Sequence, residues 1–215
     1  RVVIDRAVKV RRAGRFAVGI TVHQDDRVFL RIFGAPTGVK GDIRTKSYAE
    51  IKNLKVKGTN YNIPTFEEVL KVIDGKVPIL VEMKNHKHIG EMEIKTRDLL
   101  RKYHGKYAIE SFNPLIIRWF YKNAPEMIRG QLASPLIDEK LSKILKKLLH
   151  ALTFIKFNHS QFIAYDIEDI ATNKKVARIK QKMPIVMWTV RDPKKLETLG
   201  EYFDNYIFEG YDPKR

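Results

Sequence analysis

The sequence predicts an α/β protein in which eight strands close into a TIM (β/α)8 barrel, with the first βα unit irregular or incomplete. Three observations favour this fold. From Ser47 onward, segments of helical periodicity alternate with short apolar segments typical of buried strands. Charged or polar residues directly follow several of these strands, as they do at the carboxyl ends of barrel strands. The 215 residues, 44% of them hydrophobic, can build one large core, so we expect a single domain over residues 1–215.

The front of the chain contains candidate strands that would complete the barrel. Residues 16–22 and 28–33 are rich in apolar strand formers and are separated by the turn 24–27, and residues 1–4 form a shorter candidate. No convincing helix separates residues 1–4 from residues 16–22. The first forty residues hold seven arginines and two lysines, whereas the rest of the chain holds eight and twenty-four. This shift indicates a divergent segment or an error in the coding record.

The regular part of the chain supplies six strands, each coupled to a helix. Thr65 and Glu68 form a capping box that begins one of these helices. The predicted helices cover residues 48–54, 66–73, 91–103, 114–123, 138–157, 170–182 and 193–203. The predicted strands cover residues 79–83, 107–111, 127–132, 162–166, 184–190 and 205–209. An open doubly wound sheet would fit the same alternation less well, because no Gly-rich phosphate loop follows any strand.

The net charge of +16 indicates anionic partners such as nucleic acid, a membrane surface or phosphorylated small molecules. We expect no nucleic-acid partner, because acidic residues are interspersed among the basic ones and no known nucleic-acid-binding pattern is present. A lysine- and glutamate-rich surface of the kind found in heat-adapted proteins is the simplest explanation of the charge. The sequence does not indicate an oligomeric state.

The predicted helix 138–157 raises the alternative of membrane-surface contact, because a leucine stripe lies beside a basic face. Three lysines would gain about 3 kcal/mol at an anionic membrane. Burying each leucine on the barrel is worth about 1.5–3 kcal/mol, so burial is favoured. The chain has no cysteine, which suits a reducing compartment. Since no apolar run approaches the roughly 18–20 residues of a membrane span, we expect a soluble cytoplasmic protein.

Glu82 and Lys84 are the main candidates for chemistry. Glu82 lies near the end of the apolar segment 79–83, and Lys84 directly follows this segment. Because the two residues are two apart, their side chains point to the same side of the strand. At the carboxyl end of a barrel strand, that side is where active sites lie. A structural ion pair near the barrel opening is the alternative interpretation.

Several segments, in the right order and spacing, resemble the glycerophosphodiester phosphodiesterase family. Residues 63–70 (Ile-Pro-Thr-Phe-Glu-Glu-Val-Leu) resemble its helix start Ile-Pro-Thr-Leu-Glu-Glu-Val-Leu, and Val81-Glu82-Met83-Lys84 resembles its Ile-Glu-Ile-Lys strand. Further matches are Ser111-Phe112-Asn113-Pro114, residues 162–166, and Trp188-Thr189-Val190. The resemblance extends over about residues 45–213 and is weak in residues 1–44.

The resemblance implies a TIM barrel and metal-dependent hydrolysis of glycerophosphodiesters to glycerol 3-phosphate and an alcohol, in lipid and glycerol metabolism. It implies Glu82 as a ligand of a divalent cation, Mg²⁺ or Ca²⁺, Lys84 as a phosphate-binding and catalytic charge, and Trp188 as a wall of the substrate site. Trp188 fits a core position equally well. A cation is needed because an anionic phosphodiester repels a nucleophile, and the leaving alkoxide needs a proton.

The front of the chain departs from the family pattern. Arg6 matches the arginine of the family's His-Arg-Gly, but the histidine is replaced. Gly19 and Thr21 stand where the family has a Glu-x-Asp pair of metal ligands, and no His-Asp pair follows. His23 is a candidate replacement for a catalytic histidine, because it lies two residues after Thr21 on the same predicted strand. A histidine in a turn is the alternative.

Four further residues have weaker functional interpretations. His86 and His88 follow Lys84 and would flank a bound phosphate, and Asp166 ends a predicted strand as a weak candidate metal ligand. Asp192 precedes a proline, as a helix N-cap does. The resemblance therefore implies a phosphoric diester hydrolase that acts on a small glycerophosphodiester. The alternative is a family member that binds phosphorylated ligands without turnover.

Overall fold

The structure is a computed structural model that describes residues 7–10, 15–22, 47–55, 60–84, 88–135 and 152–211. Its strands are β1 (Ala7–Val10), β2 (Arg15–Val22), β3 (Ile79–Met83), β4 (Tyr107–Ser111), β5 (Arg129–Ala133), β6 (Phe162–Asp166), β7 (Ile185–Val190) and β8 (Asn205–Phe208). Its helices are α1 (Tyr48–Ile51), α2 (Phe66–Ile73), α3 (Glu91–Lys102), α4 (Pro114–Asn123), α6 (Ile155–Asn158), α7 (Lys174–Lys180) and α8 (Lys195–Thr198).

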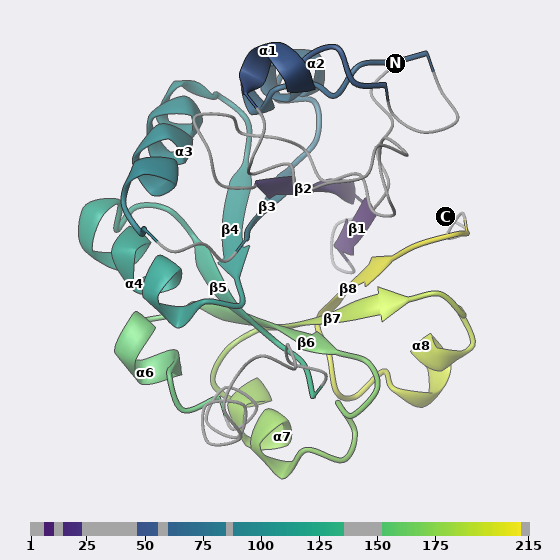
Figure 1. Cartoon of the computed structure of the whole chain (residues 1–215). Helices are drawn as coiled ribbons and strands as arrows, with labels where there is room; N and C mark the ends of the chain where they lie inside the picture. The colour runs from purple at the N-terminus through teal and green to yellow at the C-terminus, as the bar shows by residue number, and fades with distance from the viewer. Residues whose placement is uncertain are drawn as a thin grey trace.

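The strands pair in chain order from β1 to β8, and β8 pairs with β1, so the sheet closes into a barrel. Every pair from β2 to β8 is parallel. In Figure 1 the helices follow the outside of this barrel, with α3 and α4 outside β3 to β5 and α7 outside β6. The prediction of an α/β fold of the TIM-barrel type is thereby confirmed.

The first strand differs from a (β/α)8 barrel, because β1 pairs antiparallel with both β2 and β8. Only residues 11–14 separate β1 from β2. A parallel pair needs a crossover of a dozen or more residues, whereas a short connection produces a hairpin. The predicted irregularity of the first unit is therefore an antiparallel strand. The prediction of one domain over residues 1–215 stays a prediction.

Most predicted elements agree with the structure to within a few residues. The candidate strand 16–22 corresponds to β2, whereas the candidates 1–4 and 28–33 lie outside the described residues. Of the predicted helix 138–157, the structure describes the part from residue 152, which contains α6. The helix predicted over residues 193–203 is shorter in the structure, where α8 covers Lys195–Thr198, and the starts predicted at residues 127 and 170 were also too early. Met127 belongs to a turn, in which its N–H donates to Ala124 O, and α7 begins after Asn173, whose Oδ1 caps it.

The predicted capping box at the start of α2 is confirmed. The Thr65 side chain accepts a hydrogen bond from the Glu68 N–H, and Glu68 Oε2 accepts one from the Thr65 N–H at 2.7 Å. The helix buries Phe66, Val69 and Leu70 against the barrel. This face joins α3, α4, β3 and β4 in an outer apolar cluster, and a second outer cluster covers β6 to β8.

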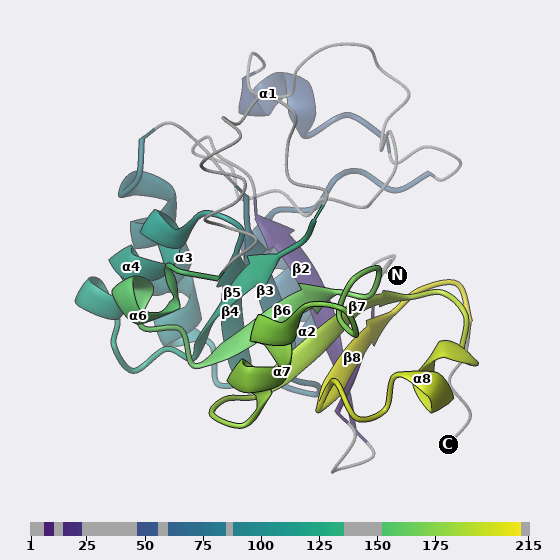
Figure 2. The ribbon, with the colours of Figure 1, turned by 90° about the horizontal axis from the view of Figure 1, so that it is seen from below.

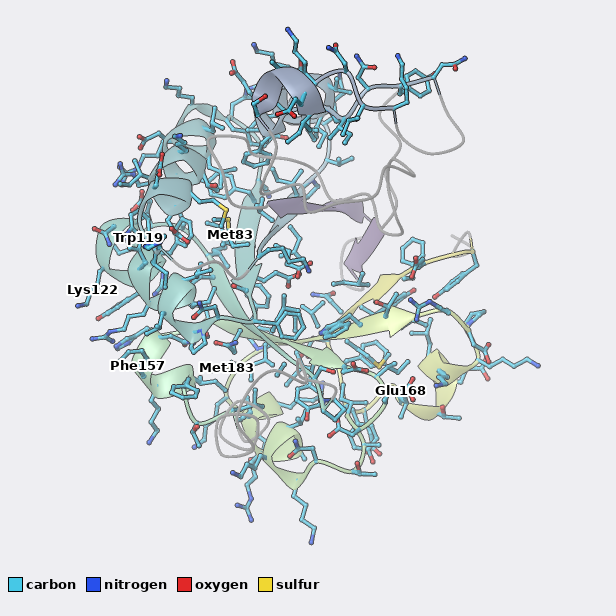
Figure 3. The ribbon with its side chains drawn as sticks, viewed as in Figure 1. Met83, Trp119, Lys122, Phe157, Glu168 and Met183 are labelled. Atoms are coloured by element: carbon cyan, nitrogen blue, oxygen red, sulfur yellow. The ribbon has the colours of Figure 1, made fainter. Side chains whose placement is uncertain are left out.

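A separate apolar cluster fills the barrel interior, because it contains residues from six successive strands. Its members are Leu80, Ala108, Phe112, Leu132, Phe162, Ala164, Val186, Trp188 and Ile207. Residues on a strand alternate between the two faces of a sheet. Met83 belongs to the outer cluster, and Figure 3 shows it between β3 and α3. The neighbouring position Glu82 therefore faces the interior, on the same side as Leu80.

Helix α1 lies apart from the helices that pack around the strands, as Figure 2 shows. Ile51 is its buried residue. The segment after α1 is held to the start of the next helical unit by a bridge between Lys55 and Asn62 and by the Ile63 N–H, which donates to Leu54 O. Within the described ranges, no helix is both long enough and apolar enough to cross a membrane.

Gly130 on β5 makes room for an aromatic ring in the barrel interior. A Cβ atom at Gly130 would lie 2.2 Å from Cε2 of Phe162. We expect Gly130→Ala to lower the free energy of unfolding by about 1–3 kcal/mol, because the ring is packed inside the barrel and cannot move freely. Chemical denaturation measures this change. Phe162→Leu in the same background should recover part of the loss, and an equal loss in both backgrounds would contradict the proposed collision.

Candidate functional site

Two glutamates face the barrel interior at the carboxyl ends of β3 and β4. Glu82 and Glu110 are register partners in the parallel pair, and both are fourth in a five-residue strand. Their inward direction follows from Leu80 and Ala108, which lie two residues earlier and belong to the interior cluster. Glu110 is 4% exposed and Glu82 is 8% exposed. Two carboxylates are therefore buried side by side at the end of the barrel where α/β folds place their sites.

Lys84 supplies a positive charge to this end of the barrel. Its Nζ donates a hydrogen bond to Glu82 Oε1, and the two groups form an ion pair. The side chain of Lys84 is 19% exposed, and that of Glu82, taken without its backbone, is 10% exposed. The position of Lys84 just after β3 places its side chain on the same side as Glu82. The predicted Glu82 and Lys84 are therefore brought together, as the spacing of the residues indicates.

The paired carboxylates make the charge balance of this region important. Neighbouring strands lie about 4.8 Å apart. Two unit charges about 5 Å apart repel by about 3 kcal/mol at an effective dielectric constant of about 20. A cation beside them offsets this repulsion, and Lys84 does so on the Glu82 side. Lys84 thus supplies one positive charge to this end of the barrel.

An aromatic pair lies beside the charged residues. The rings of Phe112 and Trp188 meet edge to face, with centroids 5.7 Å apart. Phe112 follows Glu110 by two residues, so the pair adjoins the glutamates on the inner side of the barrel. Trp188 is only partly buried, but its Nε1 atom is buried and has no hydrogen-bond partner among the described residues. The indole N–H is therefore a buried donor that makes no hydrogen bond.

Two other polar pairs lie at the same end of the barrel and are already engaged in the fold. Ser134 Oγ donates to Asp166 Oδ2 at 2.7 Å, and Asp166 Oδ1 accepts from the Glu168 N–H at 3.0 Å. Asp166 thus holds the end of β6 and the turn after it, which fits a structural role better than that of a metal ligand. Arg191 and Glu209 form an ion pair at 2.9 Å after β7 and β8.

The remaining predicted site residues are distributed as follows. Arg6, His23 and His86 lie outside the described residues, so their interpretations stay predictions. His88 is exposed. Asp192 Oδ1 accepts a hydrogen bond from the Lys194 N–H at 3.0 Å, but the N-cap of α8 is Lys194, so the prediction of Asp192 as the N-cap was wrong by two residues.

The described residues offer a limited set of metal ligands. They contain no group of three or more His, Cys, Asp or Glu side chains that could together hold an ion. Glu82 and Glu110 nevertheless provide hard oxygen donors on adjacent strands. Mg²⁺ is commonly bound through one or two carboxylates, with water and substrate phosphate completing its octahedron, whereas Ca²⁺ takes six to eight oxygens. Two carboxylates are fewer ligands than Ca²⁺ takes, and an Mg²⁺ ion there would need its other ligands from water or substrate.

Sequence reasoning missed Glu110 and Phe112 as site residues. Glu110 lies near the end of β4 and Phe112 directly follows this strand, and a signal for Glu110 was present. Glu82 and Glu110 occupy the same position in two consecutive strands of equal length. Parallel pairing without a register shift places such residues side by side. The Phe112 contact depends on the closure of the barrel, since it joins β4 to β7.

The comparisons with known proteins concern most of the chain. Residues 22–203 match the model of the glycerophosphoryl diester phosphodiesterase family. Among curated proteins no match is found. Among solved structures, an Oleispira antarctica phosphodiesterase in complex with the product sn-glycerol-3-phosphate has a TM-score of 0.67 at 19% identity, covering 88% of this chain and 78% of its own.

Two further solved structures are similar to this chain. A glycerophosphodiester phosphodiesterase from Parabacteroides distasonis has a TM-score of 0.61 at 19% identity and covers 89% of this chain and 77% of its own. One from Agrobacterium tumefaciens has a TM-score of 0.62 at 13% identity and covers 89% and 81%. At these identities the likeness to the solved structures concerns the fold.

The buried ion pair gives a testable stability difference. Lys84→Met removes the ammonium group from beside the buried Glu82 carboxylate, so we expect the free energy of unfolding to fall by about 2–3 kcal/mol. Urea denaturation at neutral pH measures the change. Lys71→Met is the matched control, because Lys71 pairs with Glu67 at 2.8 Å on the exposed surface of α2. That variant should unfold almost like the parent. Equal losses in the two variants would refute the energetic role of the inner pair.

Proposed function

Because the chain belongs to the glycerophosphoryl diester phosphodiesterase family, we propose that it hydrolyses glycerophosphodiesters to glycerol 3-phosphate and an alcohol. The site lies at the carboxyl ends of β3 and β4. The observation that carries the proposal is the buried Glu82–Lys84 pair, which faces the barrel interior and lies within the matched residues. The Oleispira antarctica phosphodiesterase of similar fold holds sn-glycerol-3-phosphate, which supports a small phosphorylated substrate.

The residues at this site have complementary roles in the proposed reaction. Lys84 binds the phosphate group, because its ammonium group is held at the barrel opening by Glu82. Glu82 is a ligand of a divalent cation, Mg²⁺ or Ca²⁺. When bound, such a cation neutralises the charge of the phosphodiester and polarises a phosphoryl oxygen. Trp188 and Phe112 form an apolar wall for the glycerol carbons or the alcohol.

The ion pair also explains how Lys84 becomes available. In the structure the ammonium group of Lys84 is directed to Glu82 Oε1. A second positive charge on the Glu82 carboxylate would repel this ammonium group and favour its contact with phosphate. Lys84 can make this exchange because its side chain is long and carries a compact charge. Glu82 thus holds the Lys84 ammonium group in place until a cation and the substrate phosphate bind.

The proton transfers require residues outside the described ranges. Hydrolysis adds water across the bond between phosphorus and the alcohol oxygen, so the water loses a proton and the alcohol gains one. We propose His23 for one of these transfers, because it follows β2, the strand that pairs with β3. We propose Arg6 as a further positive charge that contacts the phosphate.

A cytoplasmic location and a place in glycerol and lipid metabolism belong to the same proposal.

One observation favours binding without turnover as the second candidate function. Thr21 is the register partner of Glu82 and stands where the resemblance expects a carboxylate ligand. The described residues therefore contribute fewer carboxylates beside Glu82 than the family pattern implies. A chain that retains Lys84 but holds a cation weakly would bind phosphorylated ligands and leave them intact.

Hydrolysis of glycerophosphocholine distinguishes the two functions. We expect release of glycerol 3-phosphate that requires Mg²⁺, Mn²⁺ or Ca²⁺ and stops on addition of EDTA. Glu82→Gln should reduce kcat/KM by about 10²–10³, the effect of removing one electrostatic contributor to a transition state. Lys84→Met should lower kcat/KM as well, since it removes a charge from the phosphate site.

Lys71→Met serves as the activity control, because Lys71 lies on the outer surface of α2. It should retain parental turnover. Turnover that persists in EDTA or in Glu82→Gln would contradict the proposed site. Calorimetric binding of glycerol 3-phosphate without any turnover would instead establish the binding function.

A further inference from the structure

We propose that Ser111 and Gln131 are positioning residues that hold the ends of β3 and β4 in the arrangement that the phosphate site requires. The inference rests on the proposed function. The two residues are register partners on β4 and β5, and their exposed fractions are 0% and 3%. Each directly precedes a member of the interior apolar cluster, Phe112 or Leu132. Since side chains alternate between the faces of a sheet, Ser111 and Gln131 face its outer side and act from behind the site.

The hydroxyl group of Ser111 joins the end of β3 to the start of α4. Its Oγ atom donates a hydrogen bond to Met83 O at 2.7 Å and accepts one from the Asn113 N–H at 3.1 Å. Met83 O belongs to the peptide group that also contains the nitrogen of Lys84, and a peptide group is planar. The hydrogen bond that fixes this carbonyl therefore also fixes the backbone from which the Lys84 side chain extends.

The amide group of Gln131 holds the segment that carries Phe112. Its Nε2 atom donates to Ser111 O and Phe112 O, both at 3.0 Å, and to Leu132 O at 2.9 Å. Its Oε1 atom accepts a hydrogen bond from Nδ2 of the buried Asn158 at 2.6 Å. Because a carbonyl oxygen only accepts hydrogen bonds, these contacts fix which way the amide group points. The backbone at Phe112 is thereby held where its ring forms the proposed apolar wall.

Loss of either side chain disturbs the site without removing a group that contacts the substrate. Without the Ser111 hydroxyl group, the buried Met83 carbonyl loses this partner, and its peptide group turns toward another one. The Lys84 ammonium group is then displaced from the phosphate, and a displacement of about 1 Å costs about 10²-fold in an enzyme site. Lys84 is proposed to contact the phosphate of substrate and product alike. The loss should therefore appear in affinity, as a higher KM, more than in kcat.

Ser111→Ala in the full chain tests the positioning role. We expect about a tenfold rise in the KM for glycerophosphocholine with Mg²⁺ present, and a similar rise in the calorimetric Kd for glycerol 3-phosphate, with a much smaller change in kcat. Ser111→Thr keeps the hydroxyl group and should recover most of the affinity. Parental KM and Kd in a folded Ser111→Ala chain would overturn the inference, and so would a loss in Ser111→Thr as large as that in Ser111→Ala.

Tyr165→Phe is the matched control, because it also removes a buried hydroxyl group that donates one hydrogen bond and accepts one. Tyr165 Oη donates to Asp169 Oδ2 at 3.1 Å and accepts from Asn173 Nδ2 at 2.7 Å. Its ring belongs to the outer apolar cluster over β6 to β8. Both variants should lower the urea midpoint, whereas only Ser111→Ala should weaken the binding of glycerol 3-phosphate. An equal loss of affinity in the two variants would show a general structural effect and reject the positioning role.

Gln131→Met is a second variant for the case in which Ser111→Ala does not fold. Methionine has a side chain of similar length but no N–H group to hold the carbonyls of Ser111 and Phe112. We expect the Kd for glycerol 3-phosphate to rise in this variant as well. If Gln131→Met is folded and binds glycerol 3-phosphate like the parent, the role assigned to Gln131 is rejected.

The outcome for these two residues is distinguishable from the outcome for the proposed function. A parent chain that binds glycerol 3-phosphate but releases none from glycerophosphocholine rejects hydrolysis, and the Kd values of the variants still decide the positioning role. A parent chain that hydrolyses glycerophosphocholine, with KM and Kd unchanged in Ser111→Ala and Gln131→Met, supports hydrolysis and rejects this inference. A parent chain that neither binds nor hydrolyses these compounds rejects both.

Discussion

The parallel register between β3 and β4 is the constraint on which the site depends. It places Glu82 beside Glu110 on the inner side of the barrel, where the cost of burying charge is high. The Glu82–Lys84 ion pair offsets part of this cost. A protein interior keeps such a group of charges only where other interactions compensate, and the proposed cation and phosphate ester would add to that compensation.

The rest of the fold keeps these charges at one end of the barrel. Below them, the interior is closed by an apolar cluster from β3 to β8, in which Gly130 admits the Phe162 ring. Outside, the helices pack on the strands through two further apolar clusters. The strands are therefore held by apolar clusters, of whose members only Phe112 and Trp188 are also assigned to the proposed site. This division between packing and chemistry is typical of barrels with parallel strands.

Local sequence patterns were sufficient to predict much of this arrangement. Apolar runs located β3 and β4, the Thr65–Glu68 box located the start of α2, and the two-residue spacing placed Glu82 with Lys84. The direction of β1 was not predictable in this way, because its candidate residues were sought at 1–4 and pairing with β8 joins the two ends of the chain. Glu110 was missed because its importance depends on register between strands rather than on its own neighbours.

A crystal structure with Mn²⁺ and sn-glycerol 3-phosphate tests the central claim most directly. Anomalous scattering locates the ion without reference to any assumed site. The account predicts an ion bound about 2 Å from a carboxylate oxygen of Glu82, with the phosphate within hydrogen-bond distance of Lys84 Nζ. An ion or a phosphate bound only at the amino ends of the strands or on the outer helices would contradict it.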